Sequence, residues 1–296
     1  MANNKKNTKV SMGIKKANMI SNIIIYVVLV LMMIIWLFPF VCMLLESLRA
    51  EADPAGGGLS GHVIPEVWGI DAYTRLFTET RFTRWYLNTF IIAVFTAIFQ
   101  TVFVLSMSYT LSRLRFKGRK GLMNFMLILG MFPGFLSMIL LYKVMSWAHL
   151  TQNHAIVGLI IVYFASSGMG YYVSKGFFDT IPRSLDEAAR VDGANRFQVF
   201  YKIILPLSKP IVIYTVLTAF MGPWGDFMFA MYMAHTDSRG MNVAVGLKDM
   251  IDKTRIGTNY TMFCAGGIIV AVPVTTLFMF LQRYYVEGVT GGAVKG

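Results

Sequence analysis

Long apolar runs alternate with shorter polar segments along the whole chain. Six runs are long enough to cross a bilayer, at residues 20–45, 86–111, 122–145, 155–173, 211–233 and 262–281. A transmembrane helix needs roughly 20 apolar residues to cross about 30 Å of hydrocarbon. No segment shows the alternation over about 10 residues that marks a transmembrane β-strand. The pattern predicts an all-α, polytopic membrane protein with six transmembrane helices.

The first run has some features of a signal peptide, because Lys15 and Lys16 precede it and Ala50-Glu51-Ala52 follows it. Its apolar stretch is longer than a signal peptide's h-region of roughly 7–15 residues. We therefore expect an uncleaved span that starts in the cytoplasm. With six spans, the N- and C-termini are then both cytoplasmic.

Charge follows the same topology. Most of the 27 lysines and arginines fall in the segments expected on the cytoplasmic side, as the positive-inside rule requires. The net charge of +12 is therefore explained by topology, and we expect a lipid bilayer and no nucleic acid as partner. Charged residues make up only 14% of the chain, against about 25% in soluble domains. A soluble helical protein is thereby excluded.

These segments define the expected organisation. Residues 1–19 form a basic cytoplasmic N-terminus, and residues 20–296 form one transmembrane domain. Within it we expect external loops at 46–85 and 234–261, and a cytoplasmic loop at 174–210 between the fourth and fifth spans.

The cytoplasmic loop carries local signals for two short helices. Ser184 followed by Glu187 is a capping box, which predicts a helix beginning at Leu185. Gly193 should end it, because glycine accepts the left-handed conformation beyond a helix C-terminus. Asn195 can cap a second helix.

The second helix should end at Pro206 and Pro210, which lead into the fifth span. The first helix presents small Ala188 and Ala189 flanked by charge, a knob suited to a cleft in a partner protein. Two alternatives are an amphipathic linker on the membrane and a DNA-binding helix–turn–helix. The acids of the first helix disfavour the latter, because DNA phosphates would repel them.

This loop resembles the signature of importer-type ABC permeases. The signature reads Glu-Ala-Ala, three residues, Gly, nine residues and Ile-x-Leu-Pro, and it is matched here by Glu187, Ala188, Ala189, Gly193, Ile203, Leu205 and Pro206. Within that family the chain is similar to the six-span partner of the maltose-type carbohydrate permeases. Its length, its topology, its tail at residues 288–296 and the run at residues 243–247 carry that likeness.

The resemblance implies an ATP-driven importer for a maltodextrin or similar oligosaccharide in a bacterial or archaeal cytoplasmic membrane. Its implied partners are a second permease subunit, a dimer of ATP-binding subunits and an extracytoplasmic sugar-binding protein. Glu187 is expected to pair with a basic residue of the ATPase, Ala188 and Ala189 to allow close approach, and Gly193 to set the turn. The tail at residues 290–296 is expected to reach the ATPase, and the 234–261 loop to touch the binding protein.

The chain has no Gly-x-x-x-x-Gly-Lys-Ser/Thr loop to cradle phosphates. We therefore expect a transport subunit without enzymatic activity. It should bind no cofactor of its own, with ATP and Mg held by the partner ATPase.

Candidate residues for the sugar path are the polar and aromatic groups inside the spans, because sugars are bound by aromatic stacking and hydrogen bonds. They are Asn88, Gln100, Ser137, Tyr163, Trp224 and Asp226. Sugar permeases often have Trp-Asn-Asp/Glu-Phe in the fifth span, whereas this chain has Trp224-Gly225-Asp226-Phe227. An amide-to-sugar contact at position 225 is therefore in doubt.

Asp226 has two interpretations. An ionisable group inside a span is a functional-site hypothesis by default, but a fifth helix shorter than residues 211–233 would leave Asp226 near the outer interface. Pro133, Gly168, Pro223 and Pro273 mark further positions where the spans are expected to flex, since such breaks are tolerated beside other helices or a cavity.

Other functions remain as alternatives. The docking signature is shared by ABC importers of other solutes, and a proton-coupled carrier would need no ATPase. A single intramembrane acid is thin support for a proton relay. Cys42 and Cys264 fall inside spans without metal-ligand spacing, and His149 and His154 lack a third ligand, so a metalloenzyme is disfavoured.

Overall fold

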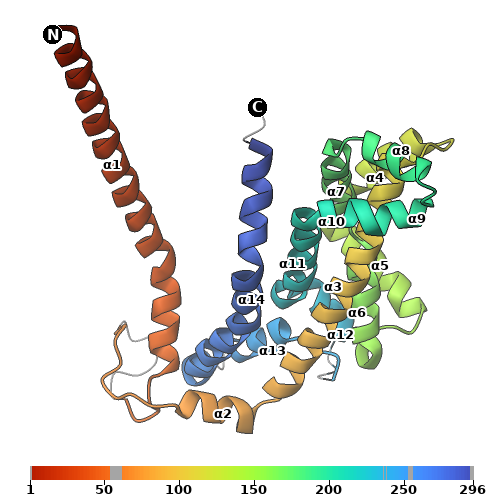
Figure 1. Ribbon diagram of the computed structural model, residues 1–296. Coiled ribbons are helices and arrows are strands. Elements are labelled where there is room, and N and C mark those ends of the chain that lie inside the picture. Colours follow the sequence, from red (N-terminus) through yellow and green to blue (C-terminus); the bar gives the residue numbers. More distant parts are fainter. Residues whose placement is uncertain (1, 54–61, 236, 238, 253–255, 294–296) are drawn as a thin grey trace.

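The computed structural model describes residues 2–53, 62–235, 237, 239–252 and 256–293 (Figure 1). In this part of the chain the regular elements are helices, with one isolated antiparallel β-bridge between Arg49 and Trp68. The first half contains α1 (Ala2–Ser47), α2 (Asp71–Glu79), α3 (Phe82–Arg113), α4 (Arg119–Gly130), α5 (Gly134–Trp147), η2 (Gln152–His154) and α6 (Ala155–Ala165). The second half contains α7 (Gly168–Thr180), α8 (Ser184–Val191), α9 (Arg196–Val199), η3 (Phe200–Ile204), α10 (Leu205–Leu207), α11 (Lys209–Gly225), α12 (Met228–Ala234), α13 (Val243–Met250) and α14 (Ile256–Ala293).

The predicted spans correspond to these helices, although not all are straight. Among the described residues, 4 helices are long and apolar enough to cross a membrane, and up to 6 if two bent pairs each count as one span. The all-α, polytopic prediction is confirmed.

The third span bends where the sequence predicts a break. The axes of α4 and α5 differ by 101°, and Pro133 lies between them with a non-helical ψ of 121°. Proline lacks an N–H donor and disfavours a helical conformation in the residue before it. A helix cannot pass this point without losing backbone hydrogen bonds.

The fifth span is shorter than predicted. Instead of one helix over residues 211–233, α11 ends at Gly225 and α12 begins at Met228. Asp226 lies between them with a ψ of 105°, which is extended. The helix is thus shorter than residues 211–233, and Asp226 sits at its end; its position near the outer interface stays a prediction.

The other predicted flexing positions behave differently from one another. The fourth span breaks between α6 and α7, directly before Gly168. Pro223 lies in the last turn of α11, whereas α14 passes through Pro273 as one helix.

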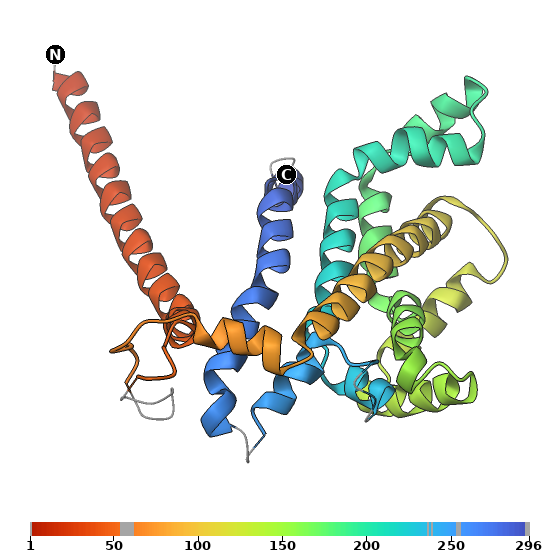
Figure 2. The ribbon, with the colours of Figure 1, turned by 90° about the horizontal axis from the view of Figure 1, so that it is seen from below.

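Helix α3 is the centre of the bundle. It packs against α6, α7 and α11, while α14 packs against α11, α13, α2 and the lower part of α1. Both views show α1 standing away from the other helices along most of its length (Figure 2). None of its most apolar window is buried inside the chain. The start of α1, the end of α14 and helices α8–α10 lie at one end of the molecule, and α2 and α13 at the other.

The two segments predicted as external loops contain the helices α2 and α13 and a buried ion-pair group. Arg49 is fully buried, with its guanidinium bonded to Glu46 at 3.0 Å and Asp53 at 3.1 Å. Helix α13, within the predicted external loop at 234–261, buries Val243, Leu247 and other side chains in the bundle core. This helix therefore packs into the bundle from the α2 end.

Candidate functional site

Helix α8 carries the Glu-Ala-Ala signature and begins one residue earlier than predicted. It runs from Ser184 to Val191 with Arg183 at the N-cap position, and no side chain caps it. The predicted Ser184–Glu187 capping box is therefore wrong, because Ser184 already has helical geometry. Asp186 and Glu187 lie in the first turn instead, where the helix dipole favours negative charge.

The turn after α8 forms as predicted. Gly193 has a φ of +86°, a left-handed conformation that costs glycine little. The N–H of Ala194 donates to the carbonyl of Ala189 at 2.9 Å, which satisfies a carbonyl at the end of α8. The Asn195 side chain caps α9 by accepting from the N–H of Gln198 at 2.9 Å. The Oε1 atom of Gln198 in turn accepts from the N–H of Asn195 at 2.8 Å.

The second helix does not end at Pro206. It continues to Leu207 through the π-helical turn η3, in which the N–H of Leu205 reaches back to the carbonyl of Phe200. Pro206 has no N–H to donate, and the wider π-helical turn before it lets the helix continue without that bond. The chain turns after Ser208 instead, where the axis changes by 84° into α11.

Arg113, the last residue of α3, fastens α8 to the bundle. Its Nη2 atom donates to the carbonyls of Phe178 at 2.9 Å and Ile181 at 2.8 Å, and its Nε lies 3.4 Å from Oδ2 of Asp186. Only 4% of the Arg113 side chain is exposed. Burial raises the pKa of the Asp186 carboxyl, while the charges of Arg113 and Arg183 oppose that shift. Arg113 thus joins α3, the end of α7 and α8 in one unit.

A second contact fastens α9 to the same helix. The hydroxyl of Tyr109 donates to the carbonyl of Arg196 at 3.2 Å, and its ring lies 4.7 Å from that of Phe200 between centroids. Ala189, Val199 and Ile204 are buried in this cluster. Two attachments to α3 therefore hold α8 and α9 in a fixed orientation.

Some residues of the Glu-Ala-Ala signature are exposed and others pack against the bundle. Glu187, Ala188, Gly193 and Pro206 are exposed, Ile203 and Leu205 are half-buried, and Ala189 is buried against the chain's own core. The expectation that Ala189 lies on the outer surface is thus wrong. Large exposed apolar side chains on these two helices are instead Val191 of α8, 87% exposed, and Phe197 of α9, 70% exposed.

Two of the sugar-path candidates are brought together. The Tyr163 hydroxyl of α6 donates to the Asp226 carboxylate, whose other oxygen accepts from the N–H of Phe229 at 3.1 Å. Trp224, two residues before Asp226, is buried in a different group of side chains, with its ring 5.3 Å from that of Tyr86. The Tyr163–Asp226 pair therefore lies at the break between α11 and α12, and Trp224 lies in the last turn of α11.

The remaining three candidates lie elsewhere. Asn88 is buried and donates its amide to the carbonyls of Arg239 at 2.9 Å and Met241 at 2.8 Å, so it holds the segment before α13. Gln100 is half-buried on α3. Ser137 lies in the first turn of α5, where its hydroxyl donates to the carbonyl of Pro133 at 3.4 Å.

Comparison with known proteins gives the family. Residues 104–291 match the family described as the inner membrane component of binding-protein-dependent transport systems. The maltodextrin permease MdxG of Bacillus subtilis is 34% identical over 286 residues, covering 96% of this chain and 100% of that protein. This chain belongs to that family.

Further relatives of the permease are named for oligosaccharides. The galactooligosaccharide permease GanQ of Bacillus subtilis is 34% identical over 92% of this chain and 94% of that protein. The maltodextrin permease MalD of Streptococcus pneumoniae is 38% identical over 76% and 80%. A crystal structure of a bacterial ABC transporter for the polysaccharide alginate shares the fold of the permease, with a TM-score of 0.76, 24% identity, and coverage of 91% and 98%.

Sequence reasoning missed Asn242, which links several parts of the permease. Its amide donates to the carbonyl of Asp226 at 2.7 Å, and its oxygen caps α13 by accepting from the N–H of Val245 at 2.9 Å. The hydroxyl of Thr89 accepts from the N–H of Val243 at 2.7 Å. An asparagine directly before an apolar run is an N-cap signal, so the cap was recognisable, although the bond to Asp226 was not.

Proposed function

We propose that the permease is one membrane-spanning subunit of an ATP-driven importer for a maltodextrin or similar oligosaccharide. Family membership and the oligosaccharide names of its relatives support this proposal. In the assembly we propose, a second permease subunit, a dimer of ATP-binding subunits and an extracytoplasmic sugar-binding protein complete the transporter. ATP and Mg are bound by the ATP-binding subunits.

The orientation follows from charge. Residues 1–19, the 174–210 loop and the C-terminal end face the cytoplasm, and the loops at 46–85 and 234–261 face outward. The start of α1, the end of α14 and α8–α10 lie at one end of the molecule, which supports this arrangement. Of the tail at residues 290–296, α14 extends to Ala293, and the last three residues lie outside the described part of the chain.

One observation carries the coupling role. Helix α8 exposes Glu187 and Ala188 on one side, while Arg113 and the buried Ala189 tie its other side to α3. Glu187 pairs with a basic residue of an ATP-binding subunit, and Val191 and Phe197 add apolar contact. When the ATP-binding subunits close, α8 moves as part of the unit that contains α3 and α7. The bundle then switches between inward-facing and outward-facing states by rigid-body motion.

The proposed sugar path rests on side-chain chemistry within the spans. The bonded pair Tyr163–Asp226 and the nearby Trp224 of α11 offer aromatic rings and a carboxylate around a helix break, and such groups bind sugars. Gln100 and Ser137 remain candidates on α3 and α5.

Transport into proteoliposomes tests the proposal. The complete transporter is reconstituted with its binding protein, and uptake of maltotriose, galactotriose and a control dipeptide is followed with ATP or with a proton gradient alone. We expect ATP-dependent uptake of an oligosaccharide and none with the gradient alone. Uptake driven by the gradient without ATP would identify a proton-coupled carrier, and ATP-driven dipeptide uptake an importer of another solute.

A further inference from the structure

A cleft of about 390 Å³ opens beside α8 and is lined mainly by cations. Its walls come from the end of α3, the segment before α8, α8 itself and the start of α9. The cleft contains five arginines, at Arg113, Arg115, Arg183, Arg190 and Arg196, and only two acids, at Asp186 and Glu187. Positive charge therefore exceeds negative charge in one concave site.

Two of these arginines are used by the fold. Arg113 is buried and donates hydrogen bonds to the carbonyls of Phe178 and Ile181. Arg183 donates from Nη2 to the carbonyl of Ser112 at 3.4 Å. Both guanidinium groups hold the walls of the cleft together.

The other three arginines are free to receive a ligand. Arg115, Arg190 and Arg196 are exposed, and within the described part of the permease their guanidinium groups have no hydrogen bond or ion pair. The positive-inside rule accounts for cations on this side of the membrane. It does not account for their convergence on one cleft from α8, from α9 and from the segment that follows α3.

An arginine cluster of this kind is suited to an oxyanion. The planar guanidinium matches a carboxylate or a phosphate with two parallel hydrogen bonds. Two sources are therefore chemically possible, a carboxylate of a partner protein and the phosphate of a lipid headgroup.

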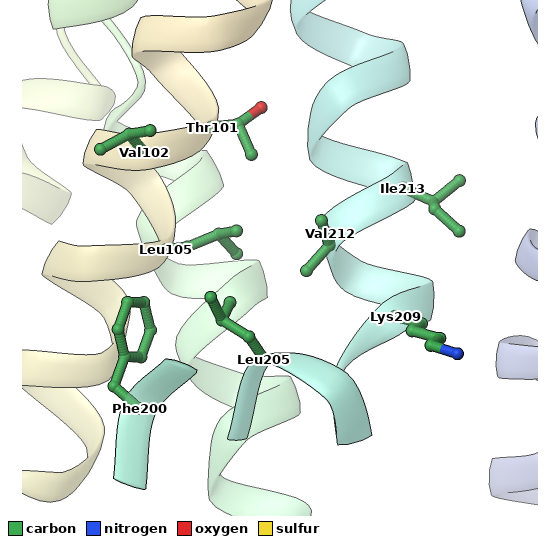
Figure 3. Close-up of a pocket in the computed structure, with 8 residues that line it drawn as sticks. All are labelled: Thr101, Val102, Leu105, Phe200, Leu205, Lys209, Val212 and Ile213. Carbon is green, nitrogen blue, oxygen red and sulfur yellow. The ribbon is translucent and has the colours of Figure 1, made fainter. Parts of the chain in front are cut away.

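The surroundings favour a protein. An apolar groove is lined by Leu105 of α3 and Val212 of α11, which point toward each other, and by Phe200 and Leu205 (Figure 3). That groove is apolar and takes no acid, and its Phe200 packs on Tyr109, which lines the cleft. Glu187 lines the cleft and also lies on the exposed face of α8. A partner protein that docks on α8 through Glu187 therefore also reaches the cleft.

We infer that the arginine cleft receives an aspartate or glutamate side chain of the ATP-binding subunit. This inference rests on the proposed docking of α8. The interface then has two opposite charge contacts side by side: Glu187 meets a cation of the ATP-binding subunit, and Arg115, Arg190 and Arg196 meet an acid. Such complementary charges fix the register of an interface and reject a reversed orientation.

The experiment measures how much ATP-binding subunit stays with the permease. The complete transporter is purified in nanodiscs of phosphatidylcholine and phosphatidylglycerol, and the ratio of ATP-binding subunit to permease is determined after washing at 150 mM salt. We expect the double change Arg190→Glu and Arg196→Glu to lower this ratio at least tenfold. The matched control Lys120→Glu reverses an exposed cation outside the cleft on the same cytoplasmic side, and it should leave the ratio unchanged.

Two further variants address folding and the identity of the acid. If the double variant does not give a monodisperse permease, Arg115→Glu replaces it, because Arg115 follows α3 and lies outside α8 and α9. In the double variant, exposed acids of the ATP-binding subunit are then changed to arginine one at a time. One such change is expected to restore at least half of the original ratio, and failure of all of them would overturn the inference.

Two other outcomes separate the alternatives. If Glu187→Lys releases the ATP-binding subunit and the arginine variants retain it, the cleft inference fails while the docking of α8 stands. If all of these variants retain it, docking through α8 fails as well. A defect that appears with phosphatidylglycerol and disappears in pure phosphatidylcholine would assign the cleft to the headgroup of an anionic lipid and overturn the inference.

Discussion

The hydroxyl of Tyr163 donates a hydrogen bond to the carboxylate of Asp226, which joins the fourth span to the break in the fifth. A hydrogen bond to a charged group contributes about 1.5–3 kcal/mol. Tyr163→Phe should therefore lower the free energy of unfolding of the detergent-solubilised permease by about that amount. Thermal unfolding followed by intrinsic fluorescence measures the change.

The control for this pair is Tyr142→Phe, which removes the hydroxyl of another half-buried tyrosine, on α5. It should have a smaller effect. Equal losses in the two variants would show that the Asp226 bond contributes nothing specific.

Asn242 connects the same break to α13. Asn242→Ala removes the cap of α13 and the bond to the carbonyl of Asp226, and loss of a cap alone costs about 0.5–2 kcal/mol. We expect faster amide hydrogen exchange in residues 243–250. Asn242→Asp keeps the capping oxygen but not the amide donor, so its exchange should lie between those of the alanine variant and the native chain. Exchange in the alanine variant as slow as in the native chain would contradict this role.

Gly246 allows α13 to lie against Trp85. A Cβ atom at this position would come within 2.1 Å of Cε3 of the buried Trp85 ring, and overpacking of a dense core is destabilising. Gly246→Ala should lower the yield of monodisperse permease in size-exclusion chromatography. Gly222→Ala is the matched control on α11, because a Cβ there meets no atom within 4 Å. It should keep or improve the yield, and identical losses would argue against the close packing of α13.

Arg113 should be required for coupling and not for docking. Arg113→Met removes two bonds to carbonyls and the charge facing Asp186, so the attachment of α8 to α3 is weakened to the packing of Ala189 and the Arg183 bond, while the exposed face of α8 remains. We expect the ATP-binding subunit to stay bound, with at least a tenfold loss of sugar transported per ATP hydrolysed. Lys117→Met, in the adjacent loop, provides the control. An unchanged transport ratio in Arg113→Met would mean that α8 is coupled through other contacts.

The sequence supports prediction of the spans and of the turn around Gly193, because both depend on local chemistry. An apolar run of this length is stable in a membrane as a helix, because a helix satisfies its own backbone hydrogen bonds. Gly193 and Asn195 act within a single turn. The break at Pro133 is local in the same way.

Features that depend on contacts between residues far apart in the sequence could not be predicted from it. Which alanine of α8 faces inward depends on the cluster around Tyr109 and Phe178. The passage through Pro206 depends on a π-helical turn packed on α3. The run containing Gly246 is too short for a span and was assigned to a loop, and its burial depends on the shape of Trp85, far away in the sequence.

The central claim is that α8 docks to an ATP-binding subunit through Glu187. The most direct test is ATP-driven oligosaccharide uptake by proteoliposomes containing the Glu187→Lys transporter, with Asp192→Lys at the other end of α8 as the matched control. Uptake should fall at least tenfold in Glu187→Lys, with the permease still present in the membrane, and should persist in Asp192→Lys. Undiminished uptake by Glu187→Lys would contradict the account.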